Sequence, residues 1–193
     1  NKDSPDEQVF QELFSLCWPA HNYGKAILGT ENSLNDMHPE IMKSFHKRQY
    51  VADNCTLAIA GDIPSNINSI IESSYLSSLY REPNKGFNKE DRKILRFAPG
   101  KRVTKIPRLE SARLLMAWEL PPANEQLKIM GAEITATLLA DGRLSRLVKR
   151  LREDLQIVDA IGIDLTVLEQ GGLIILEACC EEENLGKVEE EII

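Results

Sequence analysis

Two pairs of strand-like runs joined by short links restrict the fold of this chain more than any other feature. The runs are residues 102–106 and 112–120, linked by 107–110, and residues 158–167 and 173–180, linked around Gln170, Gly171 and Gly172. A parallel crossover needs about a dozen residues or more, so links this short require antiparallel pairing. The first pair predicts a hairpin or two adjacent strands, and the glycines of the second link fit a hairpin turn.

Helical spacing of apolar residues indicates several helices around this sheet. The predicted helices cover residues 5–18, 38–50, 64–79, 124–140 and 143–155, with a last helix from residue 184 onward. Residues 55–60 are small or branched and apolar, which fits a strand buried on both faces, and residues 81–100 predict a mobile connection. The predicted class is α+β, a mostly antiparallel sheet with helices packed on one face.

The charge balance and the cysteines exclude several function classes. The 193 residues carry a formal net charge of −7, which repels a polyphosphate backbone, so nucleic acid is not an expected partner. No apolar run approaches the roughly 20 residues that a membrane span needs, and residues 1–6 do not resemble a signal peptide. The cysteines lack paired C-x-x-C spacing and are predicted to be reduced core residues, namely Cys17, Cys55, Cys179 and Cys180.

Local motifs for hydrolytic chemistry are missing from the sequence. Neither H-E-x-x-H nor H-x-x-E-H occurs, and His46 follows His38 by eight positions, about two helical turns, which is too far for paired zinc ligation. His21 is the third and last histidine. There is also no G-x-S-x-G elbow and no phosphate-binding glycine loop. We therefore expect no catalytic residue and no metal ligand within this chain.

A run of five cations lies in the predicted helix over residues 143–155. The run either forms an anion-binding face or is a solvated helix face. Its cations alternate with apolar residues and are followed by acidic residues, which favours the solvated face. The cations are Arg143, Arg146, Lys149, Arg150 and Arg152.

Three segments of the sequence follow recognisable motifs. Residues 21–30 (HNYGKAILGT) are similar to an H-P-Y-G and I-L-G-T pattern. Residues 45–62 match F-x-x-x-Y-x-x-x-N followed by V-x-G-D through Tyr50, Asn54 and Gly61-Asp62, and residues 139–153 resemble L-G-G-G-x-S-S-R-L followed by L-R-E. Each segment alone is a weak signal, but together they span nearly the whole chain. In this order the three segments resemble the pitrilysin/insulinase family of zinc metallopeptidases, which includes the processing peptidases.

The resemblance implies the C-terminal portion of one α+β repeat, which occurs twice in the complete protein, the two halves closing like a clamshell around a peptide. It divides the chain into a helical lead-in, residues 1–53, and an α+β domain, residues 54–193, truncated at its last helix. Zinc in the full-length parent would be held by an H-x-x-E-H helix and a later glutamate, all expected upstream of Asn1. The expected function is therefore a fragment of a zinc-dependent metalloendopeptidase, inactive alone and forming part of the wall of the peptide chamber. The implied partners are a peptide substrate and a second repeat or a homologous subunit.

Two residues are candidates for contact with the substrate chamber. In many family members the L-R-E arginine, here Arg152, is followed seven residues later by a tyrosine, and in the inactive half the pair reaches the substrate. The tyrosine position holds Asp159, which cannot supply a phenol donor, and this favours the zinc-bearing half. The alternative for Arg152 is a helix-surface residue paired with an acid. The alternative functions are a non-catalytic partner subunit of the same family and an unrelated binding module, and the sequence predicts no compartment.

Overall fold

The computed structural model describes residues 5–79, 95–107 and 109–193. The chain divides into two compact units, Asn1–Ala26 with Ile94–Ile193, here called unit 1, and Ile27–Lys93, here called unit 2. Most of the predicted mobile connection, residues 81–94, lies outside the described residues. No helix among the described residues is long and apolar enough to cross a membrane. The proposed division of the repeat at residue 54 stays a prediction.

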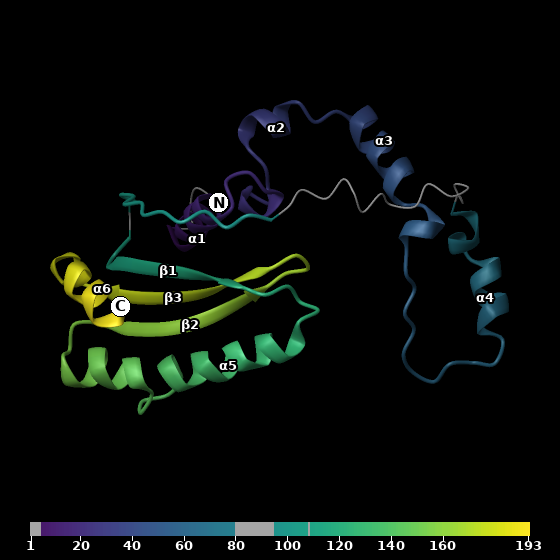
Figure 1. The fold of residues 1–193 in the computed structure, drawn as a ribbon. Coiled ribbons are helices and arrows are strands. Elements are labelled where there is room, and N and C mark those ends of the chain that lie inside the picture. Colours follow the sequence, from purple (N-terminus) through teal and green to yellow (C-terminus); the bar gives the residue numbers. More distant parts are fainter. Residues whose placement is uncertain (1–4, 80–94, 108) are drawn as a thin grey trace. The chain divides into compact units, whose positions relative to one another are not determined.

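Unit 1 is built on a three-stranded antiparallel sheet in the order β1-β3-β2 (Figure 1). Its strands are β1 (Ala112–Leu120), β2 (Ala160–Val167) and β3 (Gly172–Cys180). The predicted β2–β3 hairpin is confirmed, with Val167 opposite Gly172. Gly171 adopts φ +154° in the turn, and a Cβ on Gly172 would lie 2.1 Å from the Thr166 carbonyl oxygen, so the turn requires glycine at both positions.

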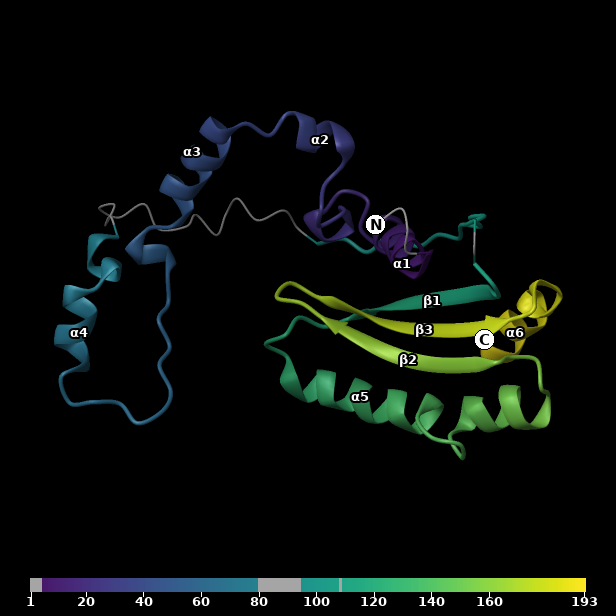
Figure 2. The ribbon, with the colours of Figure 1, turned by 180° about the vertical axis from the view of Figure 1, so that it is seen from behind.

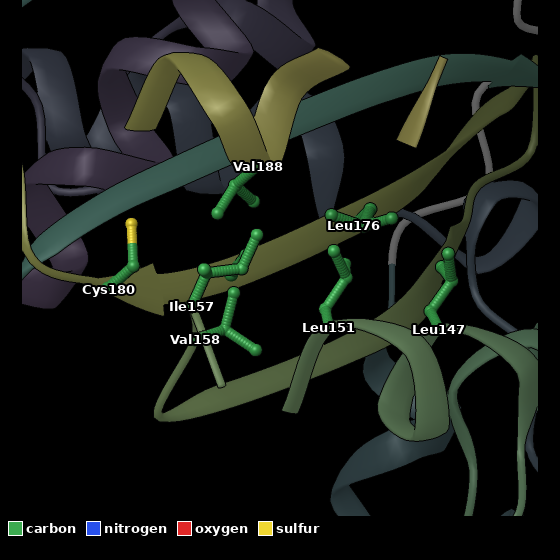
Figure 3. Packing of buried hydrophobic residues seen from close by; sticks show 8 residues of the cluster. Leu147, Leu151, Ile157, Val158, Leu176, Cys180 and Val188 are labelled. Carbon is green, nitrogen blue, oxygen red and sulfur yellow. The ribbon is translucent and has the colours of Figure 1, made fainter. Parts of the chain in front are cut away.

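Three helical segments cover one face of this sheet. They are α5 (Gln126–Ala140), the π-helix η5 (Val148–Asp154) and α6 (Leu185–Ile192), the last preceded by a 3₁₀ turn, η6 (Glu182–Asn184). Leu151 and Val188 are fully buried against Leu176 of the central strand. Figure 3 shows these side chains meeting, together with Leu147, Ile157, Val158 and Cys180. This arrangement confirms the α+β class.

Helix α1 (Pro5–Cys17) covers the other face of the sheet. Its last turn brings Cys17 and Trp18 onto Leu173 and Ile175 of β3, and all four residues are buried. A 3₁₀ turn, η1 (Asn22–Gly24), follows it. The His21 Nδ1 accepts the Tyr23 N–H there at 3.2 Å, and the Tyr23 ring packs edge-on against Trp18. The sheet therefore has an apolar cluster on each face, because side chains alternate along its strands.

Unit 2 contains short helices. They are α2 (Glu31–Asn35), α3 (Pro39–Gln49) and α4 (Ile67–Ser73), with 3₁₀ turns η2 (Ala52–Asn54) and η3 (Tyr75–Ser78). Helix α2 begins with a reciprocal capping box between Thr30 and Ser33. The predicted helix over residues 38–50 is confirmed as α3, and the one predicted over 64–79 is shorter than expected.

Two predicted strands are wrong. Residues 55–60 are exposed and form no strand, because an apolar run becomes a buried strand only where neighbouring strands flank it. Residues 102–106 do not pair with β1, which pairs with β3 instead. Cations at the start of this segment form ion pairs with two helices instead. Lys101 contacts Glu189 of α6 at 2.6 Å, and Arg102 contacts Glu12 of α1 at 2.5 Å.

The prediction that the cysteines are core residues is confirmed for Cys17 and Cys180 and wrong for Cys55. All four cysteines are free thiols; Cys17 and Cys180 are buried, Cys179 is partly buried and Cys55 is exposed. Cys55 is exposed because it begins the run of residues 55–60 that has no neighbouring strand. Burial raises the pKa of the Cys17 and Cys180 thiols.

Candidate functional site

A shallow groove of about 520 Å³ runs between helix α5 and strand β2. Strand β2 lies at the edge of the sheet and α5 packs along it (Figures 1 and 2). Gly162 forms part of the floor and has open space where a Cβ would lie. The groove is lined by Glu133, Ala136, Thr137, Ala140 and Asp141 of the α5 side and by Gly162, Ile163, Asp164 and Leu165 of β2.

The outer edge of β2 has backbone groups available for a further strand. In the described part of the chain β2 pairs only with β3. An edge strand presents a row of unpaired N–H and C=O groups, and an extended peptide can add to such an edge as another strand.

The groove is acidic. Glu133 and Asp141 are exposed, and neither forms an ion pair within residues 5–79, 95–107 and 109–193. Asp164 also lines the groove, but it pairs with Ile175, so its side chain lies on the sheet face that α1 covers. Two carboxyl groups without a local cation favour a ligand that carries positive charge. Neither β-strand periodicity nor any motif indicated this groove, because the sequence does not show that β2 lies at the sheet edge.

The two predicted chamber residues do not line this groove and do not form a pair. Arg152 lies on η5 and is exposed; among the described residues its side chain has no hydrogen-bond or ion-pair partner, so its predicted pairing with an acid is absent. Asp159 is exposed immediately before β2, and its backbone N–H donates to the Cys179 carbonyl at 2.8 Å. Their contact with a peptide stays a prediction.

The predicted basic run is a solvated helix face. All five cations are exposed, and two of them pair with acids: Arg143 with Glu153 at 3.1 Å and Arg150 with Glu191 at 2.9 Å. The hydrogen bond from Arg150 lowers the pKa of Glu191. These pairs tie the helical segments to one another.

A second polar cluster joins α1 to the sheet. Arg113 of β1 contacts Glu177 of β3 at 2.6 Å and Asp6 of α1 at 2.8 Å. Burial alone would lower the pKa of Arg113, but the hydrogen bond with Glu177 and the neighbouring charges raise it. Cys179 lies beside this cluster, and burial raises the pKa of its thiol although the Arg113 charge opposes the shift. The cluster has no nucleophile–base pair, so its role is structural.

The histidines are not brought together. His21 is buried in the turn after α1, His38 begins α3, and His46 stacks on Tyr50 in unit 2. Within the ranges that the structure describes, no group of three or more His, Cys, Asp or Glu side chains is arranged to hold a metal ion. The described residues therefore do not supply a zinc site.

Comparison with known protein families identifies the family of this chain. The family description "Peptidase M16 inactive domain" matches residues 36–193. The chain belongs to the peptidase M16 inactive-domain family. This confirms the resemblance to pitrilysin-type zinc metallopeptidases and the assignment to the C-terminal portion of a repeat.

Relatives of this M16 domain include named zinc proteases. An uncharacterized zinc protease of Rickettsia felis is 22% identical over 96% of this chain and 43% of its own length. The solved M16 inactive domain of Pseudomonas fluorescens aligns with a TM-score of 0.68 at 16% identity, over 98% of this chain and 45% of that one. A solved protease of Helicobacter pylori aligns with a TM-score of 0.66 at 16% identity, over 95% of this chain and 46% of that one. The M16 domain described here thus spans less than half the length of these proteins.

Proposed function

We propose that this M16 domain forms part of the peptide-chamber wall of a zinc metalloendopeptidase and is inactive alone. The support is its membership of the M16 inactive-domain family together with relatives that are named zinc proteases. The described residues offer no ligand set for zinc, so the metal would be held by a part of the parent protein outside this chain. Zinc would polarise the peptide carbonyl and activate water there, and no step of that chemistry is assigned to residues of this domain.

The observation that carries the proposal is the open edge of β2 beside an acidic groove. An extended peptide that added to this edge would gain backbone hydrogen bonds, independent of its sequence. Its side chains would alternate, so that some of them reach the groove. Glu133 and Asp141 would then favour lysine or arginine at those positions. The predicted chamber residues Arg152 and Asp159 would border the same peptide.

The first test measures zinc content and peptide hydrolysis for the full-length parent and for this 193-residue chain. We expect about one zinc per parent molecule and cleavage of peptides, with neither property in the isolated chain. A parent that lacks both zinc and hydrolysis would support the alternative, a non-catalytic partner subunit. Zinc binding and cleavage by the isolated chain would refute the proposal.

The second test changes the groove within the active parent. Replacing Glu133 and Asp141 with Gln and Asn removes two charges without changing shape, and exposed charge pairs contribute about 0.2–1 kcal/mol each. We therefore expect KM for Lys- or Arg-containing peptides to rise roughly three- to tenfold, while KM for neutral peptides and kcat stay unchanged. Glu190→Gln on α6, also an exposed charge removal, serves as the control. Equal effects on basic and neutral peptides would count against the groove.

A further inference from the structure

The last turn of η5 is wider than an α-helical turn. The Leu155 N–H donates to the Arg150 carbonyl at 3.0 Å. The Ile157 N–H donates to the Leu151 carbonyl, also at 3.0 Å. An α-helix closes with bonds to the carbonyl four residues earlier and, after a left-handed residue, five residues earlier. Both bonds of η5 reach one residue further back, so its last turn contains one extra residue.

A left-handed residue lies within this turn. Gln156 has φ +53°, and it is the one non-glycine residue with positive φ in the part of the chain that the structure describes. A glycine adopts this conformation freely, whereas a residue with a Cβ is destabilised in it. Such residues concentrate at functional sites, as π-helical turns also do. Two features of this kind in adjacent residues indicate that the turn has a function.

The core fixes both ends of the turn. Leu151 is 0% exposed, and Ile157 and Val158 are 7% and 6% exposed. Figure 3 shows all three in the same buried cluster. The Asp159 N–H then donates to the Cys179 carbonyl of β3 at 2.8 Å. These contacts lie inside unit 1, so they do not depend on the position of unit 2. Because neither end can shift without leaving the core, the extra residue stays in the turn.

The turn sets the register of the two predicted chamber residues. Arg152 comes directly after Leu151, and Asp159 comes directly after Val158. Without a left-handed residue at position 156 the chain does not turn back far enough to close the wide turn, and one end slips by one residue. A slip at the helical end would rotate Arg152 by about 100° about the helix axis. A slip at the strand end would turn Asp159 to the opposite face of the sheet.

We propose that Gln156 is a positioning residue, which holds Arg152 and Asp159 in the register that lets both contact a peptide added to the β2 edge. This role rests on the proposed chamber function. The requirement at position 156 is conformational, so any residue that tolerates a left-handed backbone should serve there. Glycine does so without strain, and asparagine is enriched in this conformation, whereas a β-branched valine is strongly disfavoured in it.

The test measures the dissociation constant of a fluorescently labelled peptide for the full-length parent. The peptide carries both acidic and basic residues, and a chelator prevents its cleavage. Gln156→Val should raise the dissociation constant roughly three- to tenfold, which corresponds to the loss of two exposed charge contacts. Gln156→Gly and Gln156→Asn should change it less than about twofold. Gln126→Val is the matched control, because it makes the same substitution at an exposed residue of helical conformation in α5.

Two further variants separate positioning from folding. Insertion of one glycine after Gln156 lengthens the turn without strain and should weaken binding as much as Gln156→Val does. In a parent that carries Arg152→Ala and Asp159→Ala, Gln156→Val should add less than about twofold, because the side chains that it positions are gone. Urea denaturation verifies that each variant folds.

Several results would overturn the proposal. One is a dissociation constant that neither Gln156→Val nor the glycine insertion changes, and another is equal weakening by Gln156→Val and Gln156→Gly. An undiminished effect of Gln156→Val in the double-alanine parent would show that it does not act through Arg152 and Asp159. A parent that binds the peptide but cleaves none when the chelator is absent refutes the proposed peptidase function and leaves the positioning role intact. A parent that binds no peptide overturns the positioning role itself.

Discussion

Replacing Leu151 with alanine is the sharpest test of how the helical segments pack on the sheet. Leu151 lies in the middle of η5, is 0% exposed and contacts the cluster around Leu176 and Val188. Leu127 on α5 is also a leucine, but it lies on the side of α5 that faces away from the sheet and is 86% exposed. The two Leu→Ala changes are therefore chemically identical and differ only in burial.

The size of the effect follows from that difference. Leu→Ala removes about three methyl or methylene groups, worth about 0.8 kcal/mol each in transfer from water. At Leu151 the vacated volume adds a cavity term, so the expected loss in the free energy of unfolding is about 3–5 kcal/mol. At Leu127 most of the side chain is already hydrated, and the expected loss is below about 0.5 kcal/mol.

Urea denaturation followed by circular dichroism measures both changes. With a slope of about 2 kcal/mol per molar urea, Leu151→Ala should lower the midpoint by about 2 M, and Leu127→Ala by less than about 0.3 M. A loss below about 1 kcal/mol for Leu151→Ala, or equal losses for the two variants, would refute the assigned packing of η5 and α5.

Four further predictions concern thiols and ion pairs. A thiol reagent should modify Cys55 at least about 100-fold faster than the other cysteines, because it alone is exposed. Burial raises the pKa of the Cys17, Cys179 and Cys180 thiols in the folded chain above their ordinary value of 9.0. Their contribution to the free energy of unfolding is therefore present below pH 9.0 and lost at higher pH, which unfolding at about pH 7.5 and about pH 10 should show. Arg113→Ala should cost about 1–2 kcal/mol in urea titration by leaving Glu177 unpaired, with Arg113→Lys less harmful. Because the pKa of Glu191 is lowered, its contribution is present above about pH 4.5 and lost in stronger acid, and Glu191→Gln should flatten acid unfolding curves.

Much of unit 1 was predictable because its signals are local. The glycines at 171 and 172 specify a tight turn, and the runs beside them alternate, so the β2–β3 hairpin followed directly. The spacing of Leu147, Val148 and Leu151 predicted both a helix and its buried face. On α5 the spacing of Leu127 and Ile134 predicted the helix, but these residues face away from the sheet. Apolar residues on both sides of a helix do not indicate which side the sheet covers.

The sequence did not predict the candidate groove, because local patterns do not show which elements lie side by side. Arg152 and Asp159 came from a family pattern, whereas the groove depends on α5 packing along the edge strand β2. The run at residues 55–60 has the composition of a buried strand, yet composition does not supply the neighbours that bury it.

Local signals were enough to predict the antiparallel hairpin, most of the helices and the family, because each rests on sterics or motifs within a few neighbouring residues. The pairing of β1 with β3 across more than fifty residues, the position of β2 at the sheet edge and the side of α5 that faces the sheet became known only from the fold. Such long-range pairings depend on the total burial gained by the whole chain, and no local pattern records that sum.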